Sequence, residues 1–298
     1  MSYQLRNEET IQKNIQRLAR EQLDKAIDDI DDSGLDASQS IHQVRKRCKK
    51  LRALLRLVRP ALGKTYQQEN ACFRDTARRL GVFRDKQSLV EVLERLQASL
   101  DNSERHRFDQ VLGKLRARRD AAAGTAQQDP HALLAEARKS LQKAHQRVAL
   151  WELDSEGFPA VKKGFKKTYR RGRKALESAF KTENASDFHE WRKRVKYHTH
   201  HLDLLKPLWP PILRAWRKET KTLADLLGDD HDLALLDRLL ESKKEELAKE
   251  STRKDLQKLI LCEQQRLRAQ AWTIGQRLYA ETPGALTRRW KSYWQTWT

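Results

Sequence analysis

The stretch HQVRKRCK at residues 42–49 returns 147 residues later as HEWRKRVK at residues 189–196. The same offset aligns further landmarks without a gap, namely Pro60 with Pro207, Gly81 with Gly228, Asp85 with Asp232, Leu89 with Leu236 and Leu93 with Leu240. Landmarks that stay in register over this distance indicate an internal duplication. We therefore expect two similar halves, residues 1–150 and 151–298, which together form one unit.

Helix-forming residues dominate the chain, whereas glycine (11) and proline (7) are sparse. Apolar residues recur at helical spacing, as at Ile11, Ile15 and Leu18, and alternating strand patterns are hard to find. Short connections between amphipathic helices predict antiparallel neighbours. The expected fold class is therefore all-α, with one antiparallel helical bundle in each half.

Local signals predict where the helices begin and end. Ser40 with Gln43, and Asp187 with Glu190, are expected to form capping boxes near the two octets. Gly228 is expected to end a helix, and residues 154–159 are expected to separate the halves. Other helices are expected over residues 11–31, 40–60, up to 81, 86–100, 103–123, 130–150, 161–180 and after 283.

Each octet places its basic residues on one face of a helix. At about 100° per residue, the cations of residues 42–59 share one arc, and Val44 and Cys48 lie opposite. Residues 42–59 contain no Asp or Glu, although a solvated helix face normally mixes signs. Like charges at i,i+4, as in Arg45 and Lys49, cost roughly 0.2–0.5 kcal/mol per pair. We interpret the face as an anion-binding surface, and a plain solvated face is the alternative.

The whole chain carries a large positive charge. Lys and Arg number 61 against 41 Asp and Glu, which gives a formal net charge of +20 and a pI of about 10.0. Such an excess favours an anionic partner, either nucleic acid, an anionic membrane surface or a polyanion such as polyphosphate.

Other features of the sequence restrict the class of protein. Three scattered cysteines without C-x-x-C spacing argue against a disulfide framework or a zinc site, and they favour a reducing cytoplasm. The first 20 residues lack the apolar region of a signal peptide. No run of 18 apolar residues is present, so we expect no membrane insertion.

The two octets, the R-x-L-G-x-x-R-D segment at residues 78–85 and the LLGDDHD segment at 226–232 resemble the CHAD family, named after a conserved histidine α-helical domain. The opening EETIQKNIQRLAREQL at 8–23 and the closing WKSYWQTW at 290–297 extend the resemblance over nearly the whole chain. It implies an all-α fold of two bundles related by a pseudo-twofold axis, and binding of inorganic polyphosphate. Some members carry a fused, triphosphate-hydrolysing CYTH domain. No strand-rich, glutamate-alternating segment of that kind occurs here, so we expect a stand-alone member.

The resemblance also implies which residues bind polyphosphate. They are the octet cations and histidines with two following arginines: His42, Arg45, Lys46, Lys49, Arg52, Arg56, His189, Arg192, Lys193 and Lys196. Basic residues at comparable places, and one tyrosine in a basic run, complete the predicted set: Arg74, Arg78, Arg84, Tyr169, Arg173, Lys218 and Lys221. Asp203 and Thr199 stand where the first face has Arg56 and Arg52, so the second face is shorter and less cationic.

Polyphosphate is a chain of charged groups without bases, so charge density and hydrogen-bond donors must recognise it. Arg binds phosphate oxygens bidentately, and Lys supplies a movable charge. A bound polyanion favours protonation of histidine, so we expect binding to tighten as the pH falls through the histidine range. We expect no catalysis, no cofactor and no metal, a cytoplasmic location at polyphosphate granules, and at most weak, nonspecific binding of nucleic acid.

Two alternatives concern nucleic acid and the membrane surface. A basic helical nucleic-acid-binding protein would carry the same net charge, although the basic arcs have no aromatic residue on which bases could stack. A membrane-surface protein would use Trp290, Trp294 and Trp297 at the interface. Their i, i+4, i+7 spacing equally predicts a stripe that faces the core.

The third alternative is a metal-dependent phosphohydrolase. Residues 229–232, with the sequence DDHD, and the histidines at 198, 200 and 201 are the candidate ligands. Only Asp232 has a counterpart in the first half, at Asp85. That pattern favours a carboxylate that orients the cations over one that holds a metal.

Overall fold

The protein is described by a computed structural model that covers residues 3–101, 103–124, 129–242 and 247–297, without the side chains of residues 82–86 and 122–124. Over these residues the fold is all-α, as expected, and contains no strand. The helices are α1 (Ile11–Asp31), α2 (Ala37–Leu57), α3 (Thr65–Arg79), α4 (Val82–Ala98), α5 (Asp109–Gly124), α6 (Pro130–Arg147), α7 (Gly157–Thr182), α8 (Ala185–Leu205), α9 (Pro210–Leu240), α10 (Glu250–Leu278) and α11 (Pro283–Trp297). Short 3₁₀ turns precede α5 and follow α6 and α8.

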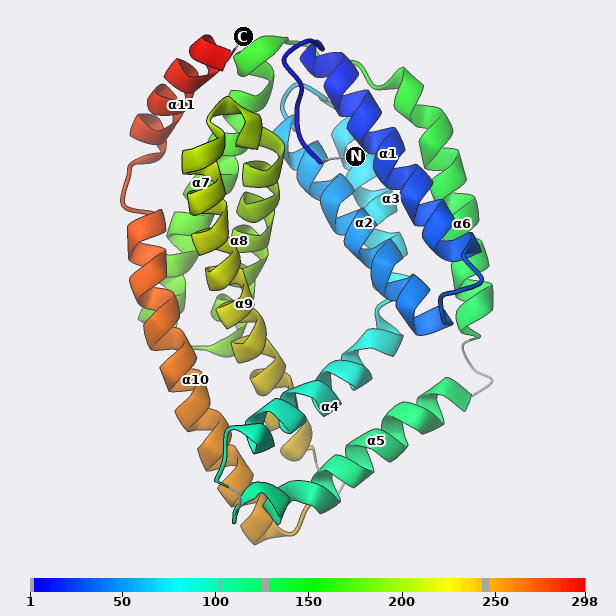
Figure 1. Ribbon diagram of the computed structural model, residues 1–298, viewed down its shortest axis with the longest axis vertical. Coiled ribbons are helices and arrows are strands. Elements are labelled where there is room, and N and C mark those ends of the chain that lie inside the picture. Colours follow the sequence, from blue (N-terminus) through cyan, green and yellow to red (C-terminus); the bar gives the residue numbers. More distant parts are fainter. Residues whose placement is uncertain (1–2, 102, 125–128, 243–246, 298) are drawn as a thin grey trace.

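The helices gather around two apolar cores. Figure 1 shows α1, α2, α3 and α6 on one side of the molecule and α7 to α11 on the other, with α4 and α5 crossing toward the far ends of α9 and α10. The larger core joins α1, α2, α3, α6, α7, α8 and α11 with parts of α9 and α10. The smaller core lies between α4, α5, the end of α9 and the start of α10. Both cores therefore contain residues from either half of the chain.

The two predicted capping boxes are wrong in position. The box that begins α2 consists of Asp36 and Gln39, whose backbone amides donate to each other's side-chain oxygens at 2.8 and 2.9 Å. In α8, Asn184 is the cap, and its Oδ1 accepts from the amide of Asp187 at 2.9 Å. Each octet therefore begins inside a helix that is already one turn long.

The predicted helix end at Gly228 is also wrong, because α9 continues through it to Leu240. The Arg192 guanidinium lies along α9 at this point, where a Cβ on Gly228 would be 3.7 Å from its Nε and Nη2, an ordinary van der Waals contact. The corresponding prediction near Gly81 is confirmed, because α3 ends at Arg79 and α4 starts at Val82.

The tryptophans near the chain end pack inward. Trp290 is 0 % exposed and Trp294 is 7 % exposed, and both belong to the larger core. The core-facing interpretation of their spacing is therefore confirmed. Among the helices of the described ranges, none is long and apolar enough to cross a membrane.

The junction of α2 with α7 and α8 brings the two octet-bearing helices together. Gly164 of α7 lies against the backbone of α2, so closely that a Cβ there would overlap the carbonyl oxygen of Leu57. Beside it, Nε2 of His201 donates to the carbonyl of Ala53 at 3.0 Å. Burial lowers the pKa of His201 to about 3 and that of His198 to about 4, so both rings are neutral core residues at pH 7.

We predict that Gly164→Ala destabilises the protein by about 2 kcal/mol or more, because the methyl group forces α7 away from α2. The matched control is Gly113→Ala in α5, where the added Cβ meets nothing within 4 Å. There the gain in helix propensity should stabilise the protein by about 0.5–1 kcal/mol. Urea unfolding of both variants measures the difference, and equal effects would show that the α2–α7 contact does not limit the packing.

Candidate anion-binding cavity

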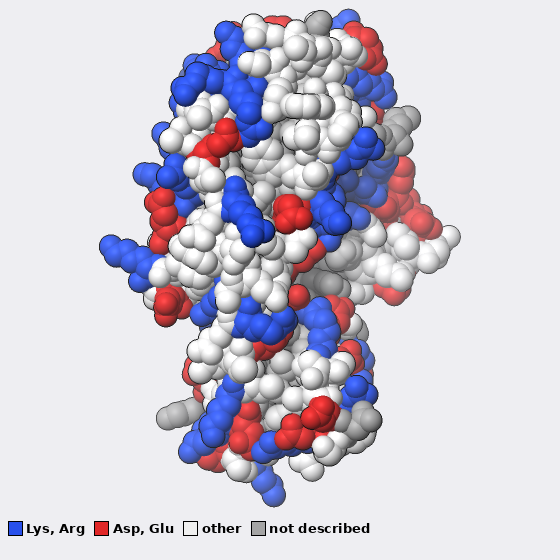
Figure 2. Space-filling view, turned by 60° about the vertical axis from the view of Figure 1, so that its left-hand side comes forward, with Lys and Arg blue, Asp and Glu red and all other residues white. Residues whose placement is uncertain are grey.

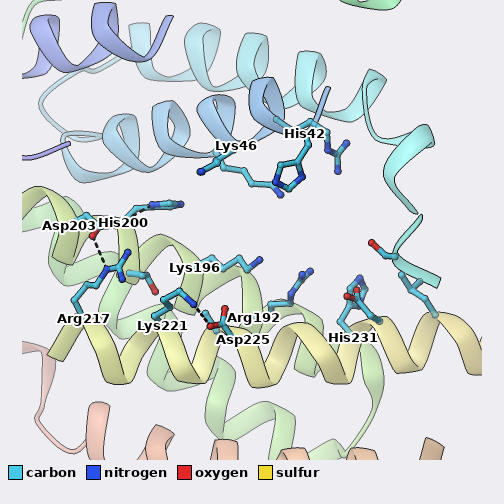
Figure 3. Close-up of a pocket in the computed structure, with 17 residues that line it drawn as sticks. His42, Lys46, Arg192, Lys196, His200, Asp203, Arg217, Lys221, Asp225 and His231 are labelled. Atoms are coloured by element: carbon cyan, nitrogen blue, oxygen red, sulfur yellow. Dashed lines mark hydrogen bonds and ion pairs between the residues drawn. The ribbon is translucent and has the colours of Figure 1, made fainter. Parts of the chain in front are cut away.

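A cavity of about 460 Å³ lies between α2 on one side and α8 and α9 on the other, and Ser88 of α4 contributes to one end. In Figure 3, His42 and Lys46 point from α2 across this space toward Arg192 and Lys196 of α8. The complete lining is His42, Arg45, Lys46, Lys49, Ser88, Arg192, Lys196, Thr199, His200, Asp203, Arg217, Lys221, Ala224, Asp225, His231, Asp232 and Leu235. The fold thus brings the two octets to opposite walls of one cavity.

The α2 wall is held in place partly by Arg45. Its Nη1 donates to the carbonyl of Ala77 at 2.6 Å, in the last turn of α3. A positive side chain there also interacts favourably with the negative end of the helix dipole. Gly81 makes room for the guanidinium, since a Cβ at Gly81 would lie 2.6 Å from the same Nη1. The position of Arg45 is therefore set by α3 and by the glycine that follows it.

The opposite wall, on α8 and α9, carries both signs of charge. Arg217 Nε donates to Asp203 Oδ1 at 2.8 Å, and Lys221 pairs with Asp225 one turn along α9. Asp232 lies near enough to Arg192 to favour its charged form electrostatically. All three acids of the described lining come from this wall, and the α2 residues of the lining include none.

The cavity as a whole is cationic. Its described lining contains seven Lys and Arg side chains against three Asp. On the side of the molecule drawn in Figure 2, by contrast, Lys and Arg are interspersed with Asp and Glu and with uncharged surface. Cationic side chains with low-dielectric walls concentrate a positive potential in a concave space, which favours an anionic ligand.

The positive potential of the cavity affects the pKa of Lys196. Its pKa is lowered to about 8 by burial and by the charge of Arg192 together, while Asp225 and Asp232 act in the opposite direction. Burial likewise lowers the pKa of the Arg192 guanidinium, against the opposing effect of Asp232. Both side chains therefore hold their charge at an electrostatic cost that a bound anion would relieve.

Two histidines meet at the α4 end of the cavity. Nδ1 of His189 lies 3.1 Å from Nδ1 of His231, so one ring donates to the other. Of these two histidines, His231 lines the cavity and His189 does not. Burial, and after it the neighbouring cations, lower the pKa of both rings, and that of His231 falls to about 3. In the ligand-free protein these rings are neutral near pH 7, so the tightening predicted from histidine protonation depends on an anion that raises these pKa values.

Of the predicted binding residues, seven line the cavity: His42, Arg45, Lys46, Lys49, Arg192, Lys196 and Lys221. His189 adjoins it through His231. The side chain of Arg84 lies outside the described residues.

Other predicted binding residues lie elsewhere. Arg52 and Arg56 continue along α2 away from the cavity, with Arg52 Nε at 3.4 Å from Asn70 Oδ1. Tyr169 is a core residue, whose hydroxyl donates to the carbonyls of Leu278 and Glu281.

The remaining predicted cations form ion pairs or line another surface. Arg74 and Arg78 pair with Asp75 on α3, and Lys193 pairs with Glu190 on α8. The others are Arg173, which pairs with Glu177, and Lys218, which lines a separate groove beside Trp216 and Arg289.

Sequence reasoning missed Arg217 and Asp225, and it did not place His231 and Asp232 beside Lys221. All five lie on one face of α9, where Arg217, Lys221, Asp225 and Asp232 follow one another at spacings of four, four and seven residues. The pattern was present in the sequence, but it extends across Gly228, where we expected the helix to end. A continuous helix over 210–240 would have revealed it.

The candidate metal ligands do not converge. Within the described ranges, no group of three or more His, Cys, Asp or Glu side chains could hold a metal ion. Asp229 pairs with Arg95 at 3.0 Å, and the buried Asp230 pairs with Arg268 at 2.7 Å. His198 and His201 are core residues, as described above.

The chain belongs to the CHAD family. The family model described as the CHAD domain matches residues 16–241, which is most of the chain and includes both octets and the whole cavity lining. No curated protein sequence matches the chain.

We predict that Lys196→Met stabilises the protein by about 1 kcal/mol at pH 7, because an apolar side chain replaces a partly buried charge among other cations. The pKa of Lys196 in the folded protein lies below its unfolded value, so the charged form costs stability below pH 8 and the cost fades as the pH rises toward 10.5. The advantage of the variant should therefore shrink between pH 7 and pH 10.

Urea unfolding at the two pH values measures this advantage. Lys46→Met is the matched control, since Lys46 is exposed on the α2 wall and should change stability by less than about 0.5 kcal/mol. An equal gain in both variants would contradict the assignment of a strained charge to Lys196.

Proposed function

We propose that the protein binds inorganic polyphosphate in the cavity between α2, α8 and α9, without converting it chemically. The observation that carries this proposal is the excess of seven Lys and Arg over three Asp in one concave lining, in which five of the seven cations come from the two octets. Arginine forks and lysine ammonium groups facing each other can hold successive phosphates of a chain from two sides. Membership of the CHAD family supports the same ligand.

The lining favours polyphosphate over nucleic acid. Its described residues include no Phe, Tyr or Trp, so bases would find no aromatic platform of the kind that single-stranded nucleic-acid sites use. A chain of phosphates without bases uses only charge and hydrogen-bond donors, and these are what the walls present. Binding should weaken steeply with added salt, because counterions are released on complex formation.

Matching contacts in the two halves support the proposed duplication. Arg45 lies against Gly81, and 147 residues later Arg192 lies against Gly228. Each octet arginine thus rests on the glycine of its own half. We therefore keep residues 1–150 and 151–298 as two pseudo-twofold-related halves of one unit in this proposal, and a cytoplasmic location at polyphosphate granules is part of it.

The proposed site differs from the residues predicted from sequence. It keeps the seven predicted residues that line the cavity, adds Arg217, and treats His189 and His231 as a pair at one end. It leaves out Tyr169, whose hydroxyl is used in the core, and the cations that pair on outer surfaces. The proposal includes no catalytic group, since the described acids of the lining pair with or face cations.

We predict that Lys46→Glu with Lys49→Glu weakens binding of long-chain polyphosphate by about 100-fold or more, because two charge-assisted contacts become repulsive. Both lysines are exposed on the α2 wall, so the fold should be retained. The matched control is Lys139→Glu with Lys143→Glu, an exposed i,i+4 pair on α6 with the same change in charge. The control should change the affinity by less than about threefold at physiological ionic strength.

Isothermal titration at one ionic strength measures these affinities for long-chain polyphosphate, triphosphate, ATP and duplex DNA. The wild-type protein should bind long-chain polyphosphate most tightly per mole of phosphate. Tighter binding of DNA, or equal losses in the two double variants, would contradict the proposed site. Release of phosphate from polyphosphate with added Mg²⁺ or Mn²⁺ would contradict a role limited to binding.

We predict a pH dependence centred on Lys196, whose charged neighbours are Arg192 on α8 and Lys221, Asp225 and Asp232 on α9. Its pKa of about 8 means that the cation is lost as the pH rises from 7 to 9, so polyphosphate affinity should fall by about tenfold over that interval. Lys196→Arg keeps its charge and should show little change. The same titrations at pH 7, 8 and 9 measure both, and parallel curves for the two proteins would exclude Lys196 as the titrating group.

A further inference from the structure

A second group of cations lies outside the cavity, on α7, on the end of α2 and the turn that follows it, and on the part of α8 that faces them. We call it the α7 cluster; it comprises Arg56, Arg59, Lys167, Arg171 and Arg194 around Gly164, Thr168 and Tyr197. These eight residues line a small pocket of about 20 Å³, and this described lining contains five Lys and Arg and no Asp or Glu. The charge density is therefore higher, relative to the acids present, than in the cavity.

Two aromatic rings hold the arginines of the cluster in place. The guanidinium carbon of Arg56 lies 4.2 Å from the ring centre of Tyr197, and its Nη1 donates to the Tyr66 hydroxyl at 2.5 Å. The guanidinium carbon of Arg59 lies 4.6 Å from the ring centre of Tyr66. Stacking on a ring face fixes the plane of a guanidinium while leaving its edge available for hydrogen bonds to an oxyanion.

The cations of the cluster also oppose one another. The charge of Arg59, then burial, then Arg171 lower the pKa of Lys167. Burial lowers the pKa of Arg171, followed by the charges of Arg194 and Arg56. Glu190 is the carboxylate that reaches the cluster, and it pairs with Arg194 and with Lys193 along α8. One acid shared in this way leaves most of the mutual repulsion in place.

The α7 cluster is separate from the cavity. No residue lines both, and Arg194 lies about 200° around α8 from Arg192, so the two arginines point to opposite sides of that helix. Between them, α2 packs directly on α7 and α8 through Leu57 with Gly164 and Ala53 with His201. A ligand in the cavity therefore cannot occupy the cluster through the interior of the protein.

We propose that the α7 cluster is a second oxyanion site, which holds one phosphate-sized group, either free phosphate or the terminal phosphoryl group of a chain. The depression of about 20 Å³ has room for about one water molecule, so a single tetrahedral anion would lie at its mouth, among the five cations, and would not be enclosed. Arginine forks stacked on Tyr66 and Tyr197 supply directed donors, and Lys167 supplies a movable charge. The site is independent of polyphosphate binding in the cavity.

Amide NMR spectra of the full chain, titrated with orthophosphate and separately with tripolyphosphate, test this site. Saturable shifts at Gly164 and Thr168 are expected, and they should persist in the Lys46→Glu, Lys49→Glu variant, whose cavity is impaired. Saturation by orthophosphate assigns the site to free phosphate. Saturation by tripolyphosphate alone assigns it to chain ends. Either result supports an oxyanion site, whereas no saturable shift with either anion overturns it.

A matched pair of variants on α7 tests which cations bind. Lys167→Ala with Arg171→Ala removes two lining charges and should weaken the anion by about tenfold or more. Lys163→Ala with Lys174→Ala removes two exposed charges of the same helix that do not line the pocket, and it should leave the affinity unchanged. Equal weakening in both pairs would reduce the effect to net charge and overturn the proposal.

Polyphosphate binding in the cavity can be tested separately from anion binding at the α7 cluster. Titration of long-chain polyphosphate into Lys167→Ala, Arg171→Ala reports on the cavity by itself, because none of its lining residues is changed. Loss of the Gly164 and Thr168 shifts in the Lys46→Glu, Lys49→Glu variant would show that the two regions form one site, and the inference of a separate one would fail.

Discussion

The two octet-bearing helices carry like charges on facing walls, and the buried junction of α2 with α7 and α8 holds them together against that repulsion. The missing side chain of Gly164 lets the backbone of α7 lie against that of α2 at Leu57, and the hydrogen bond from His201 to Ala53 satisfies a polar group inside the core. Apolar burial around this junction supplies the favourable free energy. The cavity exists because the junction fixes the distance between its walls.

This arrangement places the electrostatic cost where a ligand can relieve it. Lys196 and Arg192 are partly buried beside other cations, and both are easier to deprotonate than in water. A fold selected for stability alone would put apolar or oppositely charged side chains at these positions. The junction and the two apolar cores compensate for the strained wall, as functional sites commonly require of the surrounding structure.

Periodicity was sufficient to predict the helices and their inner faces. Val44 and Cys48 of α2 are fully buried, as the helical arc of residues 42–59 predicted, and Trp191 and Val195 at the corresponding places of α8 are fully buried too. What periodicity could not provide is which outer faces meet. The contact between His189 and His231 joins two helices, and the role of Tyr169 depends on carbonyl groups more than a hundred residues away.

The predicted helix ends were wrong for reasons that the local structure explains. Glycine often ends a helix, but α9 continues through Gly228, beside the guanidinium of Arg192. The predicted capping boxes were wrong because Asp36 and Asn184 cap the helices about one turn before the predicted caps, Ser40 and Asp187. A glycine or a capping side chain marks a constraint on the backbone or its neighbours, and only the tertiary structure shows which constraint applies.

Under the duplication proposed above, two positions of the α7 cluster correspond to acids in the opposite half of the chain. At the offset of 147, Arg56 corresponds to Asp203, and Arg171 corresponds to Asp24. Asp203 neutralises Arg217 in the cavity wall, and Asp24 pairs with His145 at 3.0 Å. At these two positions, Asp24 and Asp203 form internal ion pairs, whereas Arg56 and Arg171 belong to the α7 cluster. Acids at these two positions form internal pairs, so the excess of cations around Tyr197, of which Glu190 pairs with Arg194, is better explained by an external anion than by the needs of the fold.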